Sequence, residues 1–241
     1  NPFHTGTSTG ASYTPNVDLG IGRFNLWVRA MGPAGNSPWT AQYNFSITTA
    51  VTVTAIDRFQ STSRPTVSWN PLPGAVKYDI WINDHLSGII PYIRNQNISG
   101  TSFTQTSDMP LGLYRTWVRG ISADGIAAAW SLMNEFYVAP APLITGGNLP
   151  TFDRTPTFAW QALTGAVSYE VFVRNSTSGV VVHNPKNVTG TNWTPPADLP
   201  DGSYRWWAIG VGANNVRGQW SVPIDIYVGG RPNVLSPVGT V

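Results

Sequence analysis

Apolar and polar residues alternate in short runs along this chain, and turn-forming residues separate the runs. In residues 64–69 and 77–82 every second residue is apolar, and Gly, Pro or Asn follows each run closely. A period of two is the pattern of a half-buried β-strand. Further runs lie at 50–56, 89–93, around Phe103, and at 114–118 and 130–138. The pattern predicts about seven short strands in about 90 residues, which is typical of an antiparallel sandwich.

Aromatic residues recur at a fixed spacing along the chain. Trp117 is followed by Trp207 after 90 residues, and Trp69 by Trp160 after 91 residues. The sets of equivalent residues are Phe24, Tyr114 and Tyr204; Trp27, Trp117 and Trp207; Trp39, Trp130 and Trp220; Trp69 and Trp160; and Tyr78 and Tyr169. The changes in spacing fall in predicted loops, where insertions are tolerated. A fixed period of this length indicates a tandem array of one small domain.

The repeat divides the chain into four parts. Residues 48–138 and 139–229 are complete repeats, 1–47 match only the C-terminal half of a repeat, and 230–241 form the start of a further repeat or a tail. The predicted fold class is all-β, with tandem seven-stranded antiparallel sandwiches and an incomplete first repeat. A half sandwich exposes apolar side chains along an open edge. We therefore expect 1–47 to be completed by another chain, to pack against 48–138, or to be poorly ordered.

Four positions carry a resemblance to a known domain. They are a Trp on the second strand, a Tyr on the third, a Tyr opening the sixth, and a last strand that begins Trp-Ser. The residues are Trp69, Tyr78, Tyr114 and Trp130-Ser131 in one repeat, and Trp160, Tyr169, Tyr204 and Trp220-Ser221 in the next. This pattern resembles a fibronectin type III domain of the kind found in bacterial surface proteins, over residues 50–228 and 8–47. The resemblance implies an Ig-like seven-stranded sandwich from an extracellular or cell-surface protein, and it implies no chemistry.

Composition narrows the partners that we expect. The chain has no Cys, which excludes disulfides, Cys-based zinc sites and thiol catalysis. The net charge of +2 comes from 14 Lys and Arg against 12 Asp and Glu, without a basic cluster. Nucleic-acid binding needs a concentrated basic surface, so we expect no nucleic-acid partner. No run approaches the roughly 18 apolar residues of a membrane span, so we expect no membrane insertion.

The sequence offers no candidate catalytic residue. His4, His85 and His183 fall on predicted turns or hairpins, at positions that are not equivalent between repeats. None has a partner at metal-ligand spacing, and neither a Gly-x-Ser-x-Gly motif nor a phosphate loop is present. We therefore predict a protein that is not an enzyme and that has no cofactor and no metal site.

One acidic residue recurs in every repeat. Asp18, Asp108 and Asp198 lie six residues before Phe24, Tyr114 and Tyr204. An Asp in this place can accept backbone N–H groups in a turn, beside a corner where the Tyr hydroxyl bonds back to the chain. A calcium site is the alternative, but single carboxylates make poor cation sites. Phe24 has no hydroxyl, so the corner bond cannot form in the first repeat.

The alternation places Trp and Arg side chains together on the outer surface of the sandwich. If Tyr114, Thr116 and Val118 face the core, then Arg115, Trp117 and Arg119 face outward. This is similar to the Trp/Arg ladder of cytokine receptor domains, in which guanidinium groups lie between indole rings. The residues of the predicted stack are Arg29, Trp39, Arg115, Arg119, Trp130, Arg205 and Trp220. Asp79 and Glu170 are the expected cross-strand partners of the Arg side chains.

The same surface has an alternative interpretation as a binding platform. Trp27, Trp81, Trp117 and Trp207 would then stack on a polysaccharide or another protein, in a module that accompanies an enzyme. Recurrence of the Trp in every repeat favours the structural interpretation. We therefore predict a non-catalytic extracellular array that acts as a spacer, adhesion or assembly module. Its expected partners are other repeats or other protein chains.

Overall fold

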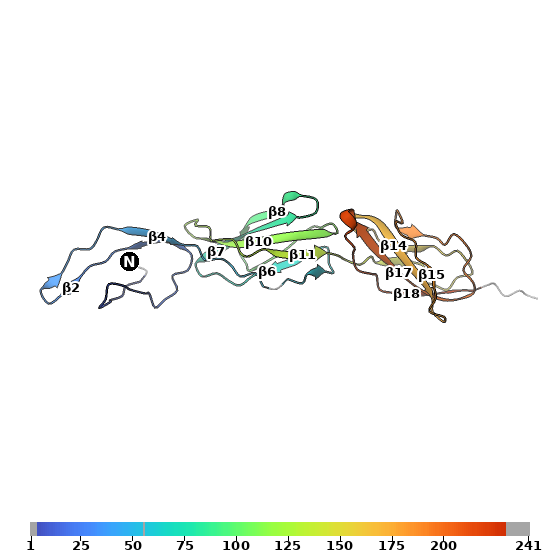
Figure 1. The fold of residues 1–241 in the computed structure, drawn as a ribbon, viewed down its shortest axis with the longest axis horizontal. Coiled ribbons are helices and arrows are strands. Elements are labelled where there is room, and N and C mark those ends of the chain that lie inside the picture. Colours follow the sequence, from blue (N-terminus) through green and yellow to red (C-terminus); the bar gives the residue numbers. More distant parts are fainter. Residues whose placement is uncertain (1–3, 55, 230–241) are drawn as a thin grey trace, which may run out of the picture. The chain divides into compact units, whose positions relative to one another are not determined.

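The computed structural model describes residues 4–54 and 56–229, and these residues fold almost entirely as β-structure (Figure 1). They form strands β1 to β18 and one 3-10 helix of three residues, Ala213–Asn215. The all-β fold class is therefore as predicted. The predicted fourth copy, 230–241, lies outside the described residues.

Two compact units make up the chain. The first contains Asn1–Asp57, Thr66–Thr104 and Tyr114–Phe136, and the second contains Arg58–Pro65, Gln105–Leu113 and Tyr137–Val241. Two short segments, 58–65 and 105–113, thus group with the sequence that follows residue 136. The boundaries at 48, 139 and 230 remain a prediction.

The strands of the first half of the chain pair in an antiparallel manner, except that β5 (Phe59–Gln60) pairs in parallel with β11 (Asn134–Val138). Their bounds are β1 (Gly22–Leu26), β2 (Met31–Gly32), β3 (Gly35–Asn36), β4 (Tyr43–Ile47), β6 (Thr66–Ser68), β7 (Ala75–Asp84), β8 (Ile89–Ile98), β9 (Ser102–Thr104) and β10 (Gly112–Ser122). Strand β1 pairs with β4, β2 with β3, and β6 with β9. A five-stranded sheet has the order β5-β11-β10-β7-β8. Strand β10 therefore lies between β7 and β11.

The second half of the chain forms two further sheets. Their strands are β12 (Ile144–Gly146), β13 (Phe158–Trp160), β14 (Ala166–Asn175), β15 (Val181–His183), β16 (Asn192–Trp193), β17 (Gly202–Gly212) and β18 (Ile224–Val228). One sheet has the order β12-β13-β16, and the other has the order β15-β14-β17-β18. These two layers enclose a core of Phe158, Trp160, Tyr169, Val171, Val173, Leu199, Tyr204, Trp206, Ala208, Ile226 and Val228.

Two predicted strands differ from the observed ones. The alternating residues 50–56 do not form a named strand; an isolated bridge between Val53 and Trp69 marks their place. The last strand is predicted to begin at Trp130, whereas β11 begins at Asn134.

Equivalent residues of the two complete repeats have nearly the same surroundings. The rings of Trp69 and Tyr78 lie 5.3 Å apart at 57°, and those of Trp160 and Tyr169 lie 5.2 Å apart at 53°. The Tyr78 hydroxyl accepts a backbone N–H in the preceding loop at 2.9 Å, and the Tyr169 hydroxyl does so at 2.8 Å. A buried Ser hydroxyl also bonds to the equivalent strand, β10 or β17, in both repeats. Ser131 and Ser221 accept the N–H of residues 118 and 208 at 3.1 Å. The repeat in sequence is a repeat in structure.

The inner face of β10 and β17 is buried as the alternation predicts. Tyr114, Thr116 and Val118 are fully buried, and so is Trp206 on β17. The Tyr204 hydroxyl donates to the Pro200 carbonyl at 2.7 Å, which is the corner bond expected in this repeat.

Residues 4–47 form only part of such a core. Phe24 on β1 and Phe45 on β4 stack at 5.5 Å, and Ile21 is buried. Leu26 and Val28 are 45% and 55% exposed, whereas the equivalent Thr116 and Val118 are fully buried. The Ile21 N–H donates to the Pro73 carbonyl at 2.8 Å, so this segment packs against residues of the following repeat. That contact is one of the three outcomes expected for an incomplete sandwich.

Candidate functional site

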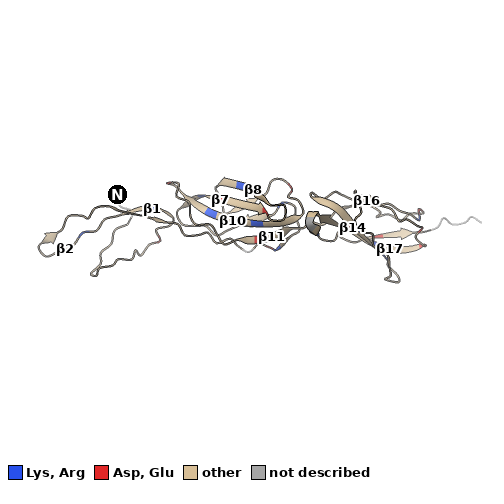
Figure 2. Ribbon diagram, turned by 45° about the horizontal axis from the view of Figure 1, so that its top comes forward, with Lys and Arg blue, Asp and Glu red and all other residues tan. Residues whose placement is uncertain are grey.

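A cluster of Trp, Arg and Asp side chains covers the outer surface of β7, β8 and β10. Asp79 on β7 is completely buried, although it points toward the outer surface of the sheet. Its Oδ2 lies 3.1 Å from Arg94 Nη2 and 2.9 Å from Arg119 Nη2. A buried carboxylate is costly unless charged donors satisfy it. Two guanidinium groups from the neighbouring strands provide donors to Oδ2, whereas the buried Oδ1 has no hydrogen-bond partner among the described residues. Figure 2 shows the blue positions on β8 and β10.

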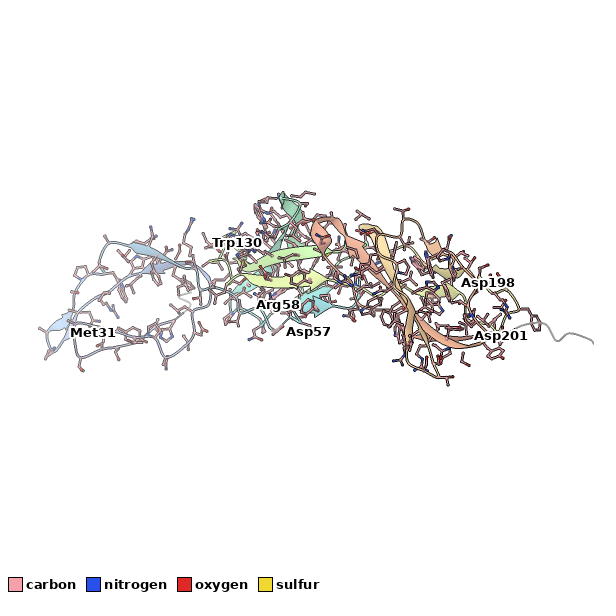
Figure 3. The ribbon with its side chains drawn as sticks, turned by 45° about the vertical axis from the view of Figure 1, so that its right-hand side comes forward. Met31, Asp57, Arg58, Trp130, Asp198 and Asp201 are labelled. Carbon is pink, nitrogen blue, oxygen red and sulfur yellow. The ribbon has the colours of Figure 1, made fainter. Side chains whose placement is uncertain are left out.

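The same two Arg side chains lie over Trp rings. The Arg119 guanidinium carbon is 4.3 Å from the centroid of Trp130, and that of Arg94 is 4.6 Å from the centroid of Trp81. Trp81 and Trp130 meet edge to face at 6.2 Å. Trp130, labelled in Figure 3, lies in the segment between β10 and β11. The two rings, the two cations and the carboxylate therefore form one closed group of contacts.

Strand register explains how these residues meet. Asp79 stands opposite Arg119, and Trp81 stands opposite Trp117 on one side and Arg94 on the other. Cross-strand neighbours on one face of a sheet lie close enough for their side chains to interact. Trp117 is half-buried in this row.

The equivalent surface of β14 and β17 also has a carboxylate, but its Arg partner comes from a different position in the chain. Glu170 occupies the place of Asp79, but Ile209 occupies the place of Arg119. Arg217, in the segment after the 3-10 helix, pairs with Glu170 instead, and its Nη2 is 2.9 Å from Oε2. This hydrogen-bonded pairing lowers the pKa of the Glu170 carboxyl, although partial burial opposes the shift. A carboxylate with an Arg partner is thus present in both complete repeats.

Aromatic contacts also recur on this second surface. Phe172 stands in the place of Trp81 and lies 5.5 Å from Trp207 and 6.2 Å from Trp220, in both cases edge to face. Arg174 on β14 lies over Trp207 at 5.4 Å. In residues 4–47, Arg29 lies over Trp39 at 4.6 Å, and Trp27 is 45% exposed.

Two Arg residues of the predicted stack have carboxylate partners on the last strand of the sheet. Arg115 Nε is 3.1 Å from Glu135 on β11. Arg205 binds Asp225 on β18 through two bonds of 2.7 Å, which lowers the pKa of the Asp225 carboxyl. The structure thus places Arg29 and Arg119 over Trp rings, and Arg115 and Arg205 beside carboxylates.

Three Arg residues of these contacts were absent from the predicted set: Arg94, Arg174 and Arg217. Arg94 lies on β8 opposite Trp81, and this alignment depends on the register between β7 and β8, which the pattern of one strand does not contain. Arg217 has no equivalent Arg in the preceding repeat, where Ala127 occupies its place. Arg217 could have been found from a comparison of the two repeats: Ile209 replaces the Arg of the preceding repeat, while the acidic residue at 170 is retained.

The recurring Asp residues Asp18 and Asp108 have different partners, and only Asp18 accepts a backbone N–H of its turn as predicted. Asp18 Oδ1 accepts the Gly20 N–H at 2.9 Å. Asp108 accepts hydrogen bonds from the Ser63 hydroxyl and from Arg64 Nε, and these two bonds lower the pKa of its carboxyl.

Within residues 4–54 and 56–229, no group of three or more His, Cys, Asp or Glu is arranged to hold a metal ion. In the same residues no helix has the length and apolar character to cross a membrane.

Comparisons with known structures identify the fold. The two-domain fibronectin type III segment of chicken tenascin superposes with a TM-score of 0.53 at 14% identity, over 76% of this chain and 98% of that one. The FN1–FN3 domains of chicken CNTN1 match at 13% identity, over 86% of this chain and 76% of that one, with a TM-score of 0.32. No family model matches the sequence, and no curated protein matches it. The chain therefore has a tandem fibronectin type III-like fold.

Proposed function

We propose that this chain is a non-catalytic, extracellular array of sandwich domains that acts as a spacer, adhesion or assembly module of a bacterial surface or secreted protein. The observation that carries the proposal is the pairing of Asp79 with Arg94 and Arg119, whose guanidinium groups lie over Trp81 and Trp130. Of the aromatic rings that would bind a ligand, Trp81 and Trp207 are already stacked on groups of the same domain. Their interactions stabilise the fold.

The recurrence of this arrangement supports a structural role. In the second complete repeat a carboxylate at the equivalent position again has an Arg partner, although the Arg comes from another part of the chain. A structural role requires that the buried acid has a cation, from whichever strand it comes. A ligand site would instead require the same side chains in the same places.

A carbohydrate- or protein-binding module, appended to an enzyme, is the second candidate function. The exposure of Trp27, Trp39 and Trp220, at 45%, 57% and 40%, favours it. Exposed indole rings can stack on sugar or on apolar partner side chains. These rings lie in different repeats, and Arg29 already lies over Trp39.

One pair of variants separates the two functions. Trp117→Ala is measured for thermal stability and for binding to a panel of soluble polysaccharides, with Tyr227→Ala as the control for loss of an exposed aromatic ring. The structural role predicts a lower melting temperature for Trp117→Ala and no polysaccharide that binds the wild-type chain in a Trp117-dependent way. A polysaccharide whose affinity falls in a variant of unchanged stability would establish the second function instead.

A further inference from the structure

The same backbone contact joins consecutive repeats in two places. The Ile21 N–H donates to the Pro73 carbonyl at 2.8 Å, and the Leu111 N–H donates to the Thr164 carbonyl at 3.0 Å. Ile21 and Leu111 are 90 residues apart, and Pro73 and Thr164 are 91 apart, so both donors and both acceptors are equivalent. Each apolar residue is buried, at 3% and 5% exposure.

A second hydrogen bond also recurs. The Ala129 N–H donates to the Thr48 carbonyl at 2.8 Å, and the Gln219 N–H donates to the Ala139 carbonyl at 3.1 Å. These pairs are again equivalent by the spacing of the repeats. They attach the segment that leads out of one repeat to the repeat that follows.

Glycines form the surface that receives the apolar residue. A Cβ at Gly120 would lie 3.2 Å from Ile21 Cδ1, and a Cβ at Gly210 would lie 3.3 Å from Leu111 Cδ1. A Cβ at Gly165 would lie 2.5 Å from Pro110 Cβ, which is too close for two carbon atoms. Equivalent glycines thus leave room for the residue that docks on them.

The last complete repeat, residues 139–229, lacks the apolar docking residue. The position equivalent to Ile21 and Leu111 is Asp201, in the same loop as Asp198 (Figure 3). Asp201 is exposed, and its Oδ1 lies 2.7 Å from Arg154 Nη2. The receiving surface consists of a Leu side chain, glycines and a backbone carbonyl. A carboxylate buried there would lose its hydration and would face another oxygen.

We propose that residue 21, 111 or 201 decides whether a repeat docks on the repeat that follows: Ile21 and Leu111 insert into a glycine-lined surface of the next repeat, and Asp201 prevents this docking. The partner that fits residues 20–22 or 110–112 is a sandwich domain with Gly at the positions of Gly74 and Gly120. The inference rests on the tandem fold and holds whether the array acts as a spacer or binds a ligand.

The chain contains the substitutions that test the proposal. Leu111→Ile gives the repeat 48–138 the residue found at position 21. Leu111→Asp gives it the residue found at position 201. Hydrogen exchange of the amides at 111 and 219 is measured in both variants and in the wild-type chain. Leu111→Ile is expected to retain protection, and Leu111→Asp to accelerate exchange at both amides by about tenfold or more. Unchanged protection in Leu111→Asp would overturn the proposal.

A second pair of variants covers the case in which Leu111→Asp unfolds its own repeat, as shown by loss of protection at the Val118 amide. Gly165→Ala and Gly179→Ala place a side chain at similar positive φ angles, 78° and 72°. Only Gly165 has atoms near the added Cβ, and these belong to residues 110 and 111. Gly165→Ala is expected to lower the melting temperature by about 5 °C more than Gly179→Ala. Equal losses in the two variants would overturn the proposal.

Discussion

Arg119 contacts Trp130 and Asp79 at the same time: its guanidinium carbon lies 4.3 Å from the indole centroid, and its Nη2 lies 2.9 Å from the carboxylate. The carboxylate orients the guanidinium group, and the ring covers its flat face. Such a contact adds stability because the guanidinium group loses little hydration, and the ring and the carboxylate replace what it loses. The account of this protein as a structural array depends on this relationship.

Removal of the buried carboxylate is expected to be the most damaging single change on this surface. Asp79→Ala leaves Arg94 and Arg119 close together without the shared anion, and the expected loss of unfolding free energy is about 3–5 kcal/mol. Urea unfolding followed by Trp fluorescence measures it. Asp225→Ala, which removes an exposed carboxylate paired with Arg205, is the control, and equal losses in the two variants would show that burial of Asp79 has no special role.

The Glu170–Arg217 pair predicts a pH dependence of stability. The folded-state pKa of Glu170 lies below its ordinary value of 4.5. The pair therefore stabilises the fold fully above the ordinary pKa, and this stabilisation is lost as the pH falls through the lower, folded-state pKa. As the pH falls from 5 to 3, wild type should lose more stability than Glu170→Gln. Parallel stability curves for the two proteins would contradict the prediction.

The Tyr corner predicts a modest and specific loss. Tyr204→Phe removes the 2.7 Å bond to the Pro200 carbonyl while the buried ring remains. We expect a loss of about 1–2 kcal/mol in unfolding free energy. Tyr227→Phe is the control, since Tyr227 is 51% exposed. If the control loses as much stability as Tyr204→Phe, the corner bond contributes nothing of its own.

The predicted boundaries at 48–138 and 139–229 are testable by mechanical unfolding. A chain pulled from its two ends should show two principal unfolding events, because each complete sandwich unfolds cooperatively. Each event should release about 30 nm, the extended length of about 90 residues. One event of twice this length, or many short ones, would show that the repeats are not separate folding units.

Much of the fold could be predicted from aromatic residues in fixed phase. Trp69 and Tyr78 mark the inner face of two strands, and their copies at 160 and 169 make the same contacts, because core packing repeats when sequence and spacing repeat. The first strand of each repeat was harder to predict. Residues 50–56 alternate well, yet the described residues among them form an isolated bridge with Trp69 in place of a strand.

The stack could be predicted only in part. Alternation places Arg119 and Trp117 outward, and Trp-Ser at 130–131 marks the segment that leads to the last strand. The partner of each Arg depends on register between strands, which the pattern of one strand does not contain. Arg94 reaches Asp79 from the neighbouring strand β8. Arg217 reaches Glu170 from a loop.

The contact between repeats was not predictable from alternation. Ile21 and Leu111 lie in loops where an apolar residue has no periodic neighbours. The difference at 201 becomes meaningful once the glycines that face residue 111 are known. Equivalent positions that change from Ile and Leu to Asp are the signal that an alignment of the three repeats could have shown.

A double-mutant cycle between Arg119 and Trp130 tests the central claim most directly. Arg119→Ile, which copies residue 209, and Trp130→Ala are made singly and together, and unfolding free energies come from hydrogen exchange of the Val118 amide. The account predicts a favourable coupling of about 0.5–2 kcal/mol between the two side chains. Additive effects, with no coupling, would contradict an intramolecular stack that stabilises the fold.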